Sequence, residues 1–232
     1  MKYLEVVIGG SSGVGEELKK RLTEARGNNA ETIDISRNSN GSTIKKCITD
    51  LNVVDFIGWT RNEYEINIYF CQRYRGNDPL KEYRIHVIEP VRVVNMLLGS
   101  NYKIKSIIFL TSTCSVMPVE NQGVMYHACR GAIESVVRKL AVDLGKKNVR
   151  VNGLALNTIM KNSNHEFYTK NKDIKNFYDC QTPLSHMGSA REVAGACLAL
   201  TEDNCSFITG QIITVDGGLS LVNQENFKHA PK

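Results

Sequence analysis

A glycine-rich loop near the amino terminus constrains the fold more than any other feature of this 232-residue sequence. Residues 5–8 favour a strand, residues 9–15 read Gly-Gly-Ser-Ser-Gly-Val-Gly, and residues 16–25 favour a helix. In such a unit the first glycine allows a sharp turn, the second lets a phosphate approach the backbone, and the third brings helix and sheet together. The helix amino terminus then faces a pyrophosphate. A plain glycine turn is the alternative. The strand–helix context favours a dinucleotide site, with Gly9, Ser11, Ser12, Gly13, Val14 and Gly15 as candidate residues.

Short β-rich segments alternate with helix-length patterns along the rest of the chain. We expect strands at 4–8, 31–36, 43–48, 66–71, 106–111, 149–154 and 211–215, and helices at 13–25, 80–98, 124–144 and 190–200. This alternation is typical of βαβ units in a parallel sheet that is covered on both faces. The sequence therefore predicts one doubly wound α/β domain with a seven-stranded parallel sheet over residues 1–220. The polar stretch 161–180 is expected to be a mobile insertion and 221–232 a loose tail.

Composition argues against several classes of protein. No apolar run approaches the roughly 18 residues that a membrane-spanning helix needs, so no membrane partner is expected. The start of the chain lacks the small-residue cleavage site of a signal peptide. The 7 cysteines form no C-x-x-C pair and no metal-ligand spacing with the histidines. We therefore expect reduced thiols, no metal site and a cytoplasmic location. The net charge of +5 is spread along the chain, which disfavours a nucleic-acid partner and suits a small anionic ligand.

Several motifs resemble the short-chain dehydrogenase/reductase family, and the resemblance extends to about residue 220. The glycine loop is similar to the T-G-x-x-x-G-x-G of that family, with Ile8 in place of the threonine. Residues 126–130, Tyr-His-Ala-Cys-Arg, resemble its Y-x-x-x-K with arginine at the last position. Pro183-Leu184, Met187-Gly188, Ile208–Gln211 and Val215–Gly218 are similar to its carboxyl-terminal signature. The resemblance implies a Rossmann-type fold, oxidoreductase activity with a nicotinamide cofactor, and a homodimer or homotetramer.

The end of the second expected strand bears on the choice of cofactor. An acidic residue there would bind the ribose 2′-hydroxyl of NAD and would repel a 2′-phosphate. On the family pattern Ser36 takes this position with Arg37 beside it, and Asp34 is expected to lie deeper. A guanidinium is suited to bidentate phosphate binding, although a solvated strand-end charge is the alternative. The sequence thus predicts NADP(H). By resemblance, Asp50 and Leu51 would bind the adenine, and Ile159 is a further cofactor-binding candidate.

The resemblance also implies a catalytic set. Ser112, at the end of an expected strand, would orient a carbonyl, and Tyr126 would donate a proton. Arg130 follows one helical turn later, so that both side chains lie on one face, and would hold the cofactor ribose. A nearby cation stabilises a phenolate, but a guanidinium effectively never releases its own proton. His86 stands in place of a helix asparagine, either in a water relay or as a buried structural residue.

Two functional hypotheses follow from these motifs. The first is an NADPH-dependent ketoreductase, most similar to 3-oxoacyl-carrier-protein reductases, acting on a small-molecule carbonyl that is free or carrier-bound. The second is a catalytically impaired nucleotide-binding subunit or sensor, favoured by Arg130 and by Tyr-Phe-Cys-Gln at 69–72 where the family has N-N-A-G. The aromatic residues of the insertion either line a substrate pocket or pack against their own helices; these are Phe167, Tyr168, Phe177 and Tyr178.

Overall fold

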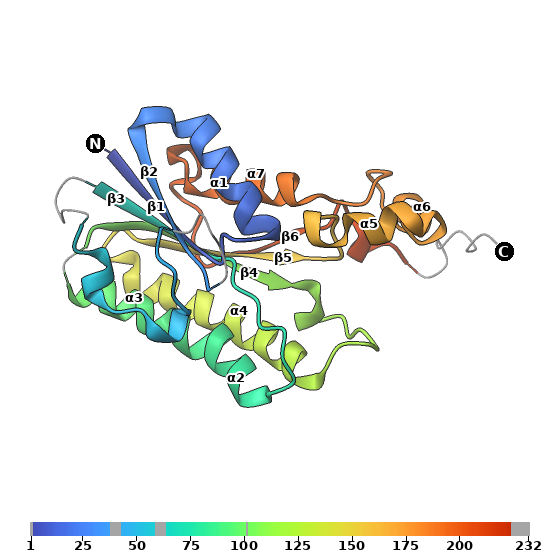
Figure 1. The fold of residues 1–232 in the computed structure, drawn as a ribbon, viewed down its shortest axis with the longest axis horizontal. Coiled ribbons are helices and arrows are strands. Elements are labelled where there is room, and N and C mark those ends of the chain that lie inside the picture. Colours follow the sequence, from blue (N-terminus) through green and yellow to red (C-terminus); the bar gives the residue numbers. More distant parts are fainter. Residues whose placement is uncertain (1, 38–42, 59–63, 101, 224–232) are drawn as a thin grey trace.

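Six parallel strands form one sheet in the order β2-β1-β3-β4-β5-β6 in the computed structural model (Figure 1). The structure describes residues 2–37, 43–58, 64–100 and 102–223, so most of the expected tail lies outside the described residues. The strands are β1 (Lys2–Ile8), β2 (Ala30–Ile35), β3 (Tyr64–Phe70), β4 (Ile104–Ser112), β5 (Arg150–Leu156) and β6 (Ile212–Val215). Because β2 and β3 flank β1 on opposite sides, the chain reverses its direction of winding between β1 and β3.

Helices cover both faces of the sheet. α1 (Gly13–Arg26) and α7 (Ala190–Thr201) lie on one face, and α3 (Glu89–Gly99) and α4 (Val124–Gly145) lie on the other (Figure 1). Each face has its own apolar core, one built around Leu18 and Val193 and the other around Val94 and Val137. The predicted single-domain, doubly wound α/β architecture is therefore confirmed.

Single-turn 3-10 helices occupy several of the connections. These are η1 (Gly27–Asn29), η2 (Ile48–Asp50), η3 (Val53–Phe56), η5 (Thr113–Ser115), η6 (Asp203–Cys205) and η7 (Leu219–Leu221).

The strand expected at 43–48 is wrong. Ile44 forms one isolated bridge with Ile35, and the chain then turns into η2. The carbonyl oxygens of Ile48 and Leu51 each accept a hydrogen bond from the Arg92 guanidinium at 2.8 Å. Since a side chain satisfies these groups, the segment needs no neighbouring strand. The described residues contain six strands and not seven.

The helix expected at 80–98 is present but interrupted. α2 (Pro79–Tyr83) runs into a π-helical turn, η4 (Arg84–Ile88), before α3 begins at Glu89. Pro90 has no N–H to donate to the carbonyl one α-helical turn earlier, and the N–H of Glu89 donates instead to the carbonyl of Arg84. The wider turn contains His86, which is buried.

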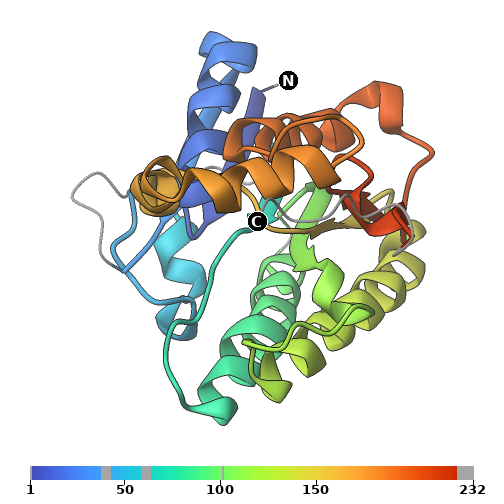
Figure 2. The ribbon, with the colours of Figure 1, turned by 90° about the vertical axis from the view of Figure 1, so that its right-hand side faces the viewer.

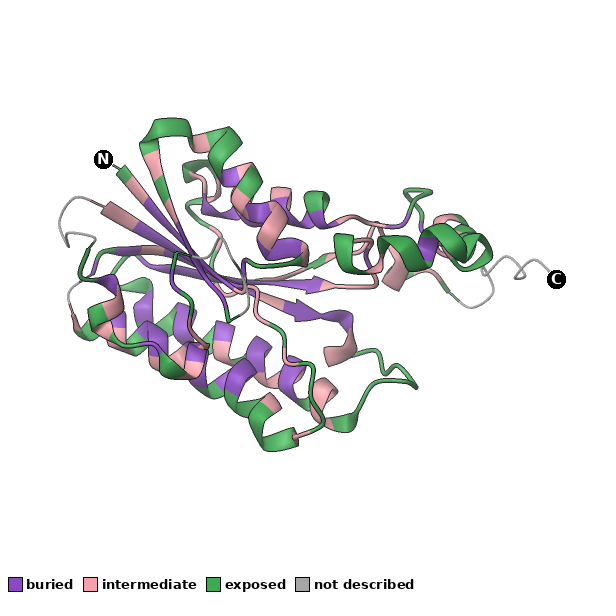
Figure 3. Cartoon of the chain, in the orientation of Figure 1, coloured by how far each residue is buried: buried purple, intermediate pink, exposed green. Residues whose placement is uncertain are grey.

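The segment expected to be a mobile insertion forms two helices, α5 (Asn162–Lys170) and α6 (Lys172–Gln181). Figure 2 looks onto the carboxyl ends of the strands, with α5 and α6 across one side and α2 and α4 on the other. Figure 3 shows that α5 and α6 are largely exposed, whereas the strands are largely buried. In the described part of the chain, no helix combines the length and apolar character needed to cross a bilayer.

Candidate functional site

The glycine loop joins β1 to α1 at the reversal point of the sheet, where ligands of open α/β sheets bind. Gly9 has a φ of 91°, and a Cβ there would lie 2.6 Å from the backbone nitrogen of Gln72, which follows β3. A Cβ on Gly15 would overlap the carbonyl oxygen of Gly9. Glycine is therefore required at both positions, because the loop packs against β3 on one side and against α1 on the other.

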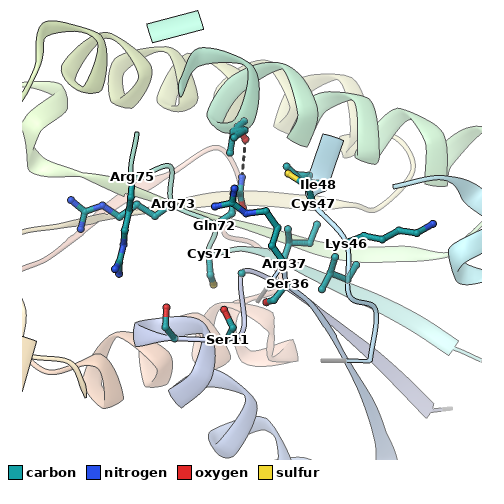
Figure 4. A pocket seen from close by; sticks show the side chains of 15 residues that line it. Ser11, Ser36, Arg37, Lys46, Cys47, Ile48, Cys71, Gln72, Arg73 and Arg75 are labelled. Carbon is teal, nitrogen blue, oxygen red and sulfur yellow. Dashed lines mark hydrogen bonds between the residues drawn. The ribbon is translucent and has the colours of Figure 1, made fainter. Parts of the chain in front are cut away.

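A cavity of about 390 Å³ opens in front of this loop (Figure 4). Gly9, Ser11 and Ser12 line it, while Gly13, Val14 and Gly15 form the first turn of α1. Its described lining holds four basic side chains and no acidic one; the basic residues are Arg37, Lys46, Arg73 and Arg75. Figure 4 shows Arg73 and Arg75 on one side of the cavity and Lys46 extending away on the other. Lys46 pairs with Asp55 at 2.6 Å. The lining therefore suits an anionic ligand.

The acidic residue of β2 is withdrawn from this cavity. Asp34 is 2% exposed and is not among the lining residues. Its carboxylate pairs with the Lys19 ammonium at 2.5 Å and accepts a hydrogen bond of 2.8 Å from the Ser36 hydroxyl. Ser36 and Arg37 do line the cavity, as the sequence predicts. The Ser36 hydroxyl proton, however, is already engaged by Asp34, which leaves Arg37 as the exposed donor at this end.

Three candidate cofactor residues lie away from the cavity. Leu51 is 1% exposed within the apolar core, and Asp50 is exposed and accepts a hydrogen bond from the Thr49 hydroxyl at 2.9 Å. Cys47 and Ile48 line the cavity, whereas the rest of η2, which begins at Ile48, does not. Ile159 is buried and lines none of the described cavities, whereas its neighbours Asn157 and Thr158 line a second one.

The second cavity, also of about 390 Å³, contains the catalytic candidates Ser112 and Tyr126. Ser112 is the last residue of β4, and its hydroxyl donates to the Leu156 carbonyl at 3.1 Å and accepts from the Cys114 amide at 3.2 Å. Tyr126 lies in the first turn of α4. Tyr168 and Tyr178, from α5 and α6, also line this cavity.

The other two aromatic residues of the insertion, Phe167 and Phe177, are 50% and 38% exposed and lie outside the described linings. The two tyrosines thus match the pocket interpretation, whereas the two phenylalanines do not.

Arg130 is directed into the protein and away from the described cavities. It is 5% exposed, and its guanidinium carbon lies 4.5 Å from the centroid of the Tyr126 ring. One terminal nitrogen donates to the Leu110 carbonyl at 3.4 Å, and the other lies 3.3 Å from Nε2 of His86. Its Nε is buried without a partner among the described residues. In this structure the guanidinium makes a cation–π contact with Tyr126, the residue that the sequence places one helical turn before it.

His86 holds Arg130 from the π-helical turn. It is 2% exposed, and its Nε2 also lies 3.2 Å from the backbone N–H of Tyr74, which donates to it. Burial, together with the charges of Arg130 and Arg73, lowers the pKa of His86 to about 3. The ring is therefore neutral near pH 7, with Nε2 as an acceptor. His86 is thus a buried hydrogen-bond acceptor that lines none of the described cavities.

Sequence inspection missed one residue that the cavities share. Arg73 lines the glycine-loop cavity, the Ser112–Tyr126 cavity and a third cavity beside α2. In the sequence it belongs to Gln72-Arg73-Tyr74-Arg75, which directly follows an expected strand. A basic residue that follows the carboxyl end of the strand next to the glycine loop is expected near a bound ligand, and this pattern could have identified Arg73 from the sequence. No group of three or more candidate metal ligands occurs within residues 2–37, 43–58, 64–100 and 102–223.

Comparisons with known proteins agree with this architecture. A family model described as enoyl-(acyl carrier protein) reductase matches residues 87–220. A tropinone reductase homolog of Arabidopsis thaliana is 34% identical over 116 residues, which cover 50% of this chain and 44% of the relative. The 7alpha-hydroxysteroid dehydrogenase of Escherichia coli is 34% identical over 109 residues, covering 46% of this chain and 42% of that protein. The chain thus spans about half the length of the curated relatives it matches.

Solved structures are similar over nearly the whole chain. A short chain dehydrogenase family protein from Francisella tularensis has a TM-score of 0.75 at 22% identity, covering 96% of this chain and 100% of that one. ElxO with NADP bound has a TM-score of 0.77 at 16% identity, with the same coverage. At these identities the likeness shows the fold alone.

Proposed function

Because the chain belongs to the short-chain dehydrogenase/reductase family of oxidoreductases, we propose that it reduces the ketone of a small molecule to an alcohol with NADP(H). The observation that carries this proposal is the adjacency of two cavities. One is a basic cavity at the glycine loop, and the other contains Ser112 and Tyr126; Arg73 lines both.

The first cavity fits a dinucleotide cofactor. The close packing of the glycine loop leaves no space for a Cβ at Gly9 or Gly15. The described lining of the cavity carries no acidic side chain that would repel phosphates. Ser11 and Ser12 would hold the pyrophosphate with the amides of the first turn of α1. Arg37 would hold a 2′-phosphate, since the Asp34 carboxylate is paired with Lys19 and does not line the cavity. These features favour NADP(H) over NAD(H).

The second cavity supplies the groups that act on a carbonyl. A bound nicotinamide would supply the hydride. The Tyr126 phenol gives its proton to the carbonyl oxygen: its O–H bond breaks as the O–H bond of the alcohol forms. The Arg130 guanidinium carbon lies 4.5 Å from the ring centroid and packs over the face of the Tyr126 ring, which would hold the phenol in position. The Ser112 hydroxyl would exchange its bond to the Leu156 carbonyl for one to the substrate oxygen.

Kinetics of a tyrosine variant test this function. NADPH oxidation is followed with a panel of ketones, 3-oxoacyl thioesters and enoyl thioesters, since the matching family model is described by enoyl reduction. We expect ketone reduction, with kcat lowered about 10²- to 10⁴-fold in Tyr126→Phe and NADPH affinity retained. Tyr83→Phe, which removes a partly exposed hydroxyl on α2, is the control. Turnover that survives in Tyr126→Phe would exclude Tyr126 as the proton donor.

A nucleotide-binding subunit or sensor without catalytic activity is the second candidate. The inward direction of Arg130 favours it, because this side chain lines none of the described cavities and lies over the Tyr126 ring. This candidate predicts NADPH binding without turnover, and Tyr126→Phe would then alter binding alone. Arg130→Lys separates the two further: increased turnover would identify a weakened enzyme.

Assembly and location complete the proposal. We propose a homodimer or homotetramer, because the edge strand β6 leaves Ile212 and Ile213 only half-buried and Phe207, which precedes it in the chain, is fully exposed. A small-molecule carbonyl, free or carried on a protein, is the proposed partner. A reducing cytoplasm is the proposed location, since all seven cysteines are free thiols.

A further inference from the structure

Arg73 lies where the three described cavities meet. It lines the glycine-loop cavity, the cavity of Ser112 and Tyr126, and a third cavity of about 600 Å³ between residues 73–82 and the start of α4. Arg75 lines the first and the third of these but not the second. Arg73 is therefore the arginine that shares a cavity with both catalytic candidates.

The segment that carries Arg73 is anchored by hydrogen bonds of the residues on either side of it. The Gln72 amide donates to the Ile85 carbonyl at 3.3 Å, and the backbone N–H of Tyr74 donates to His86 at 3.2 Å. The Tyr74 hydroxyl accepts a hydrogen bond from the Asp78 amide at 3.2 Å. Because successive residues of this extended segment alternate in direction, the anchored Gln72 and Tyr74 leave Arg73 and Arg75 exposed toward the cavities.

The charge of this region is uncompensated within the described residues. Neither Arg73 nor Arg75 forms an ion pair there, and Glu82 is the one acidic residue in the lining of the third cavity. Lys161 places a further basic side chain beside the glycine loop. Its Cδ lies 3.4 Å from the position that a Cβ on Gly13 would take. Burial lowers the pKa of Lys161, and the charges of Arg73 and Arg75 lower it further. An anion bound among these groups would relieve their mutual repulsion.

We propose that the substrate carries an anionic group, a carboxylate or a phosphate, which Arg73 binds beside Ser112 and Tyr126. The inference rests on the proposed ketone reduction and names its substrate class. Arg75 and Lys161, next to the glycine loop, would instead serve the cofactor phosphates. The planar guanidinium of Arg73 can bind either anion with two hydrogen bonds.

Matched substrates that differ in one charge test the proposal. Acetoacetate and methyl acetoacetate form the carboxylate pair, and dihydroxyacetone phosphate and dihydroxyacetone form the phosphate pair. We expect the wild-type protein to prefer one anion over its neutral partner in kcat/KM. Arg73→Gln should raise KM for that anion about 10- to 100-fold, a larger factor than its effect on KM for the neutral ketone or on NADPH affinity, because Arg73 also lines the glycine-loop cavity. Arg75→Gln should weaken NADPH binding but keep the ratio of anion to neutral ketone.

Calorimetry separates failure of this inference from failure of the reductase function. Each anion is titrated into the protein saturated with NADP⁺, and into the Arg73→Gln variant. Binding that depends on Arg73 without any turnover would sustain the anion site and reject the reductase. Turnover with equal kcat/KM for charged and neutral partners would reject the anion site alone. The inference is also overturned if neither anion binds. It is likewise overturned if Arg73→Gln weakens NADPH binding by the same factor as anion binding.

Discussion

At the scale of single residues, the proposed preference for NADP(H) rests on Asp34 and Arg37. The Asp34 carboxylate is buried against Lys19, and Arg37 lies on the cavity wall. We predict that Arg37→Asp weakens NADPH binding about 10- to 100-fold and leaves NADH binding equal or tighter, because a charge-assisted hydrogen bond is replaced by repulsion. Calorimetry with both nucleotides measures the ratio of their affinities.

A second charge reversal serves as the control for Arg37. Lys45→Asp makes the same change in net charge at an exposed position that lines none of the described cavities. This variant should change the affinities for NADPH and NADH weakly and by similar factors, because salt screens the field of a distant surface charge. An unchanged NADPH-to-NADH ratio in Arg37→Asp would count against the assignment of the 2′-phosphate site.

His86 makes the stability of the fold sensitive to acid. Its pKa is about 3 in the folded chain and about 6.5 in the unfolded chain, so the unfolded state binds more protons between these values. Its contribution to stability is complete above about pH 6.5 and is lost progressively as the pH falls toward 3. We predict that proton binding by this one residue in the unfolded chain lowers the free energy of unfolding by about 2 kcal/mol as the pH falls from 6.5 to 5.

Urea unfolding at several pH values measures this effect. His86→Gln keeps a hydrogen-bond acceptor but does not titrate, so its unfolding free energy should fall less steeply over the same interval. Parallel pH profiles for the two proteins would show that the acid sensitivity arises elsewhere.

At the scale of elements, the packing of α1 on the glycine loop is testable with a pair of helical glycines. A Cβ on Gly15 would overlap the Gly9 carbonyl, whereas nothing lies within 4 Å of a Cβ on Gly131 in α4. We predict that Gly15→Ala destabilises the fold by about 1–3 kcal/mol and weakens NADPH binding. Gly131→Ala should stabilise the fold by about 0.5–1 kcal/mol. Thermal unfolding of both variants gives the comparison, and equal stability changes would contradict the packing argument.

The elements also mark where local patterns stop being informative. The helices that begin at Gly13, Val124 and Ala190 start where the sequence predicts, because the periodic spacing of their apolar residues is visible in the local sequence. The segment at 43–48 has strand-like residues but pairs with β2 only through the bridge of Ile44, and Arg92 from a distant helix binds the carbonyls of Ile48 and Leu51. The π-helical turn at 84–88 depends on Pro90 and on the burial of His86, which a helical periodicity does not reveal.

At the scale of the whole molecule, the sheet order brings together what the motifs name separately. The glycine loop, the end of β4 and the start of α4 were all predicted from sequence, and their side chains line adjacent cavities. The direction of Arg130, the anchoring of the loop at 72–75 and the place of Arg73 could not be predicted, because they depend on contacts between residues far apart in the chain. Resemblance alone identified Leu51 and Ile159, and the cores bury both.

A crystal structure with NADPH bound tests the central claim, that the two cavities form one cofactor and substrate site, most directly. We predict the 2′-phosphate on Arg37, the pyrophosphate at the glycine loop, and the nicotinamide in the cavity of Ser112 and Tyr126, with the Tyr126 hydroxyl facing the reactive carbon of the ring. A nicotinamide that lies outside this cavity, or a Tyr126 hydroxyl turned away from it, would contradict the account.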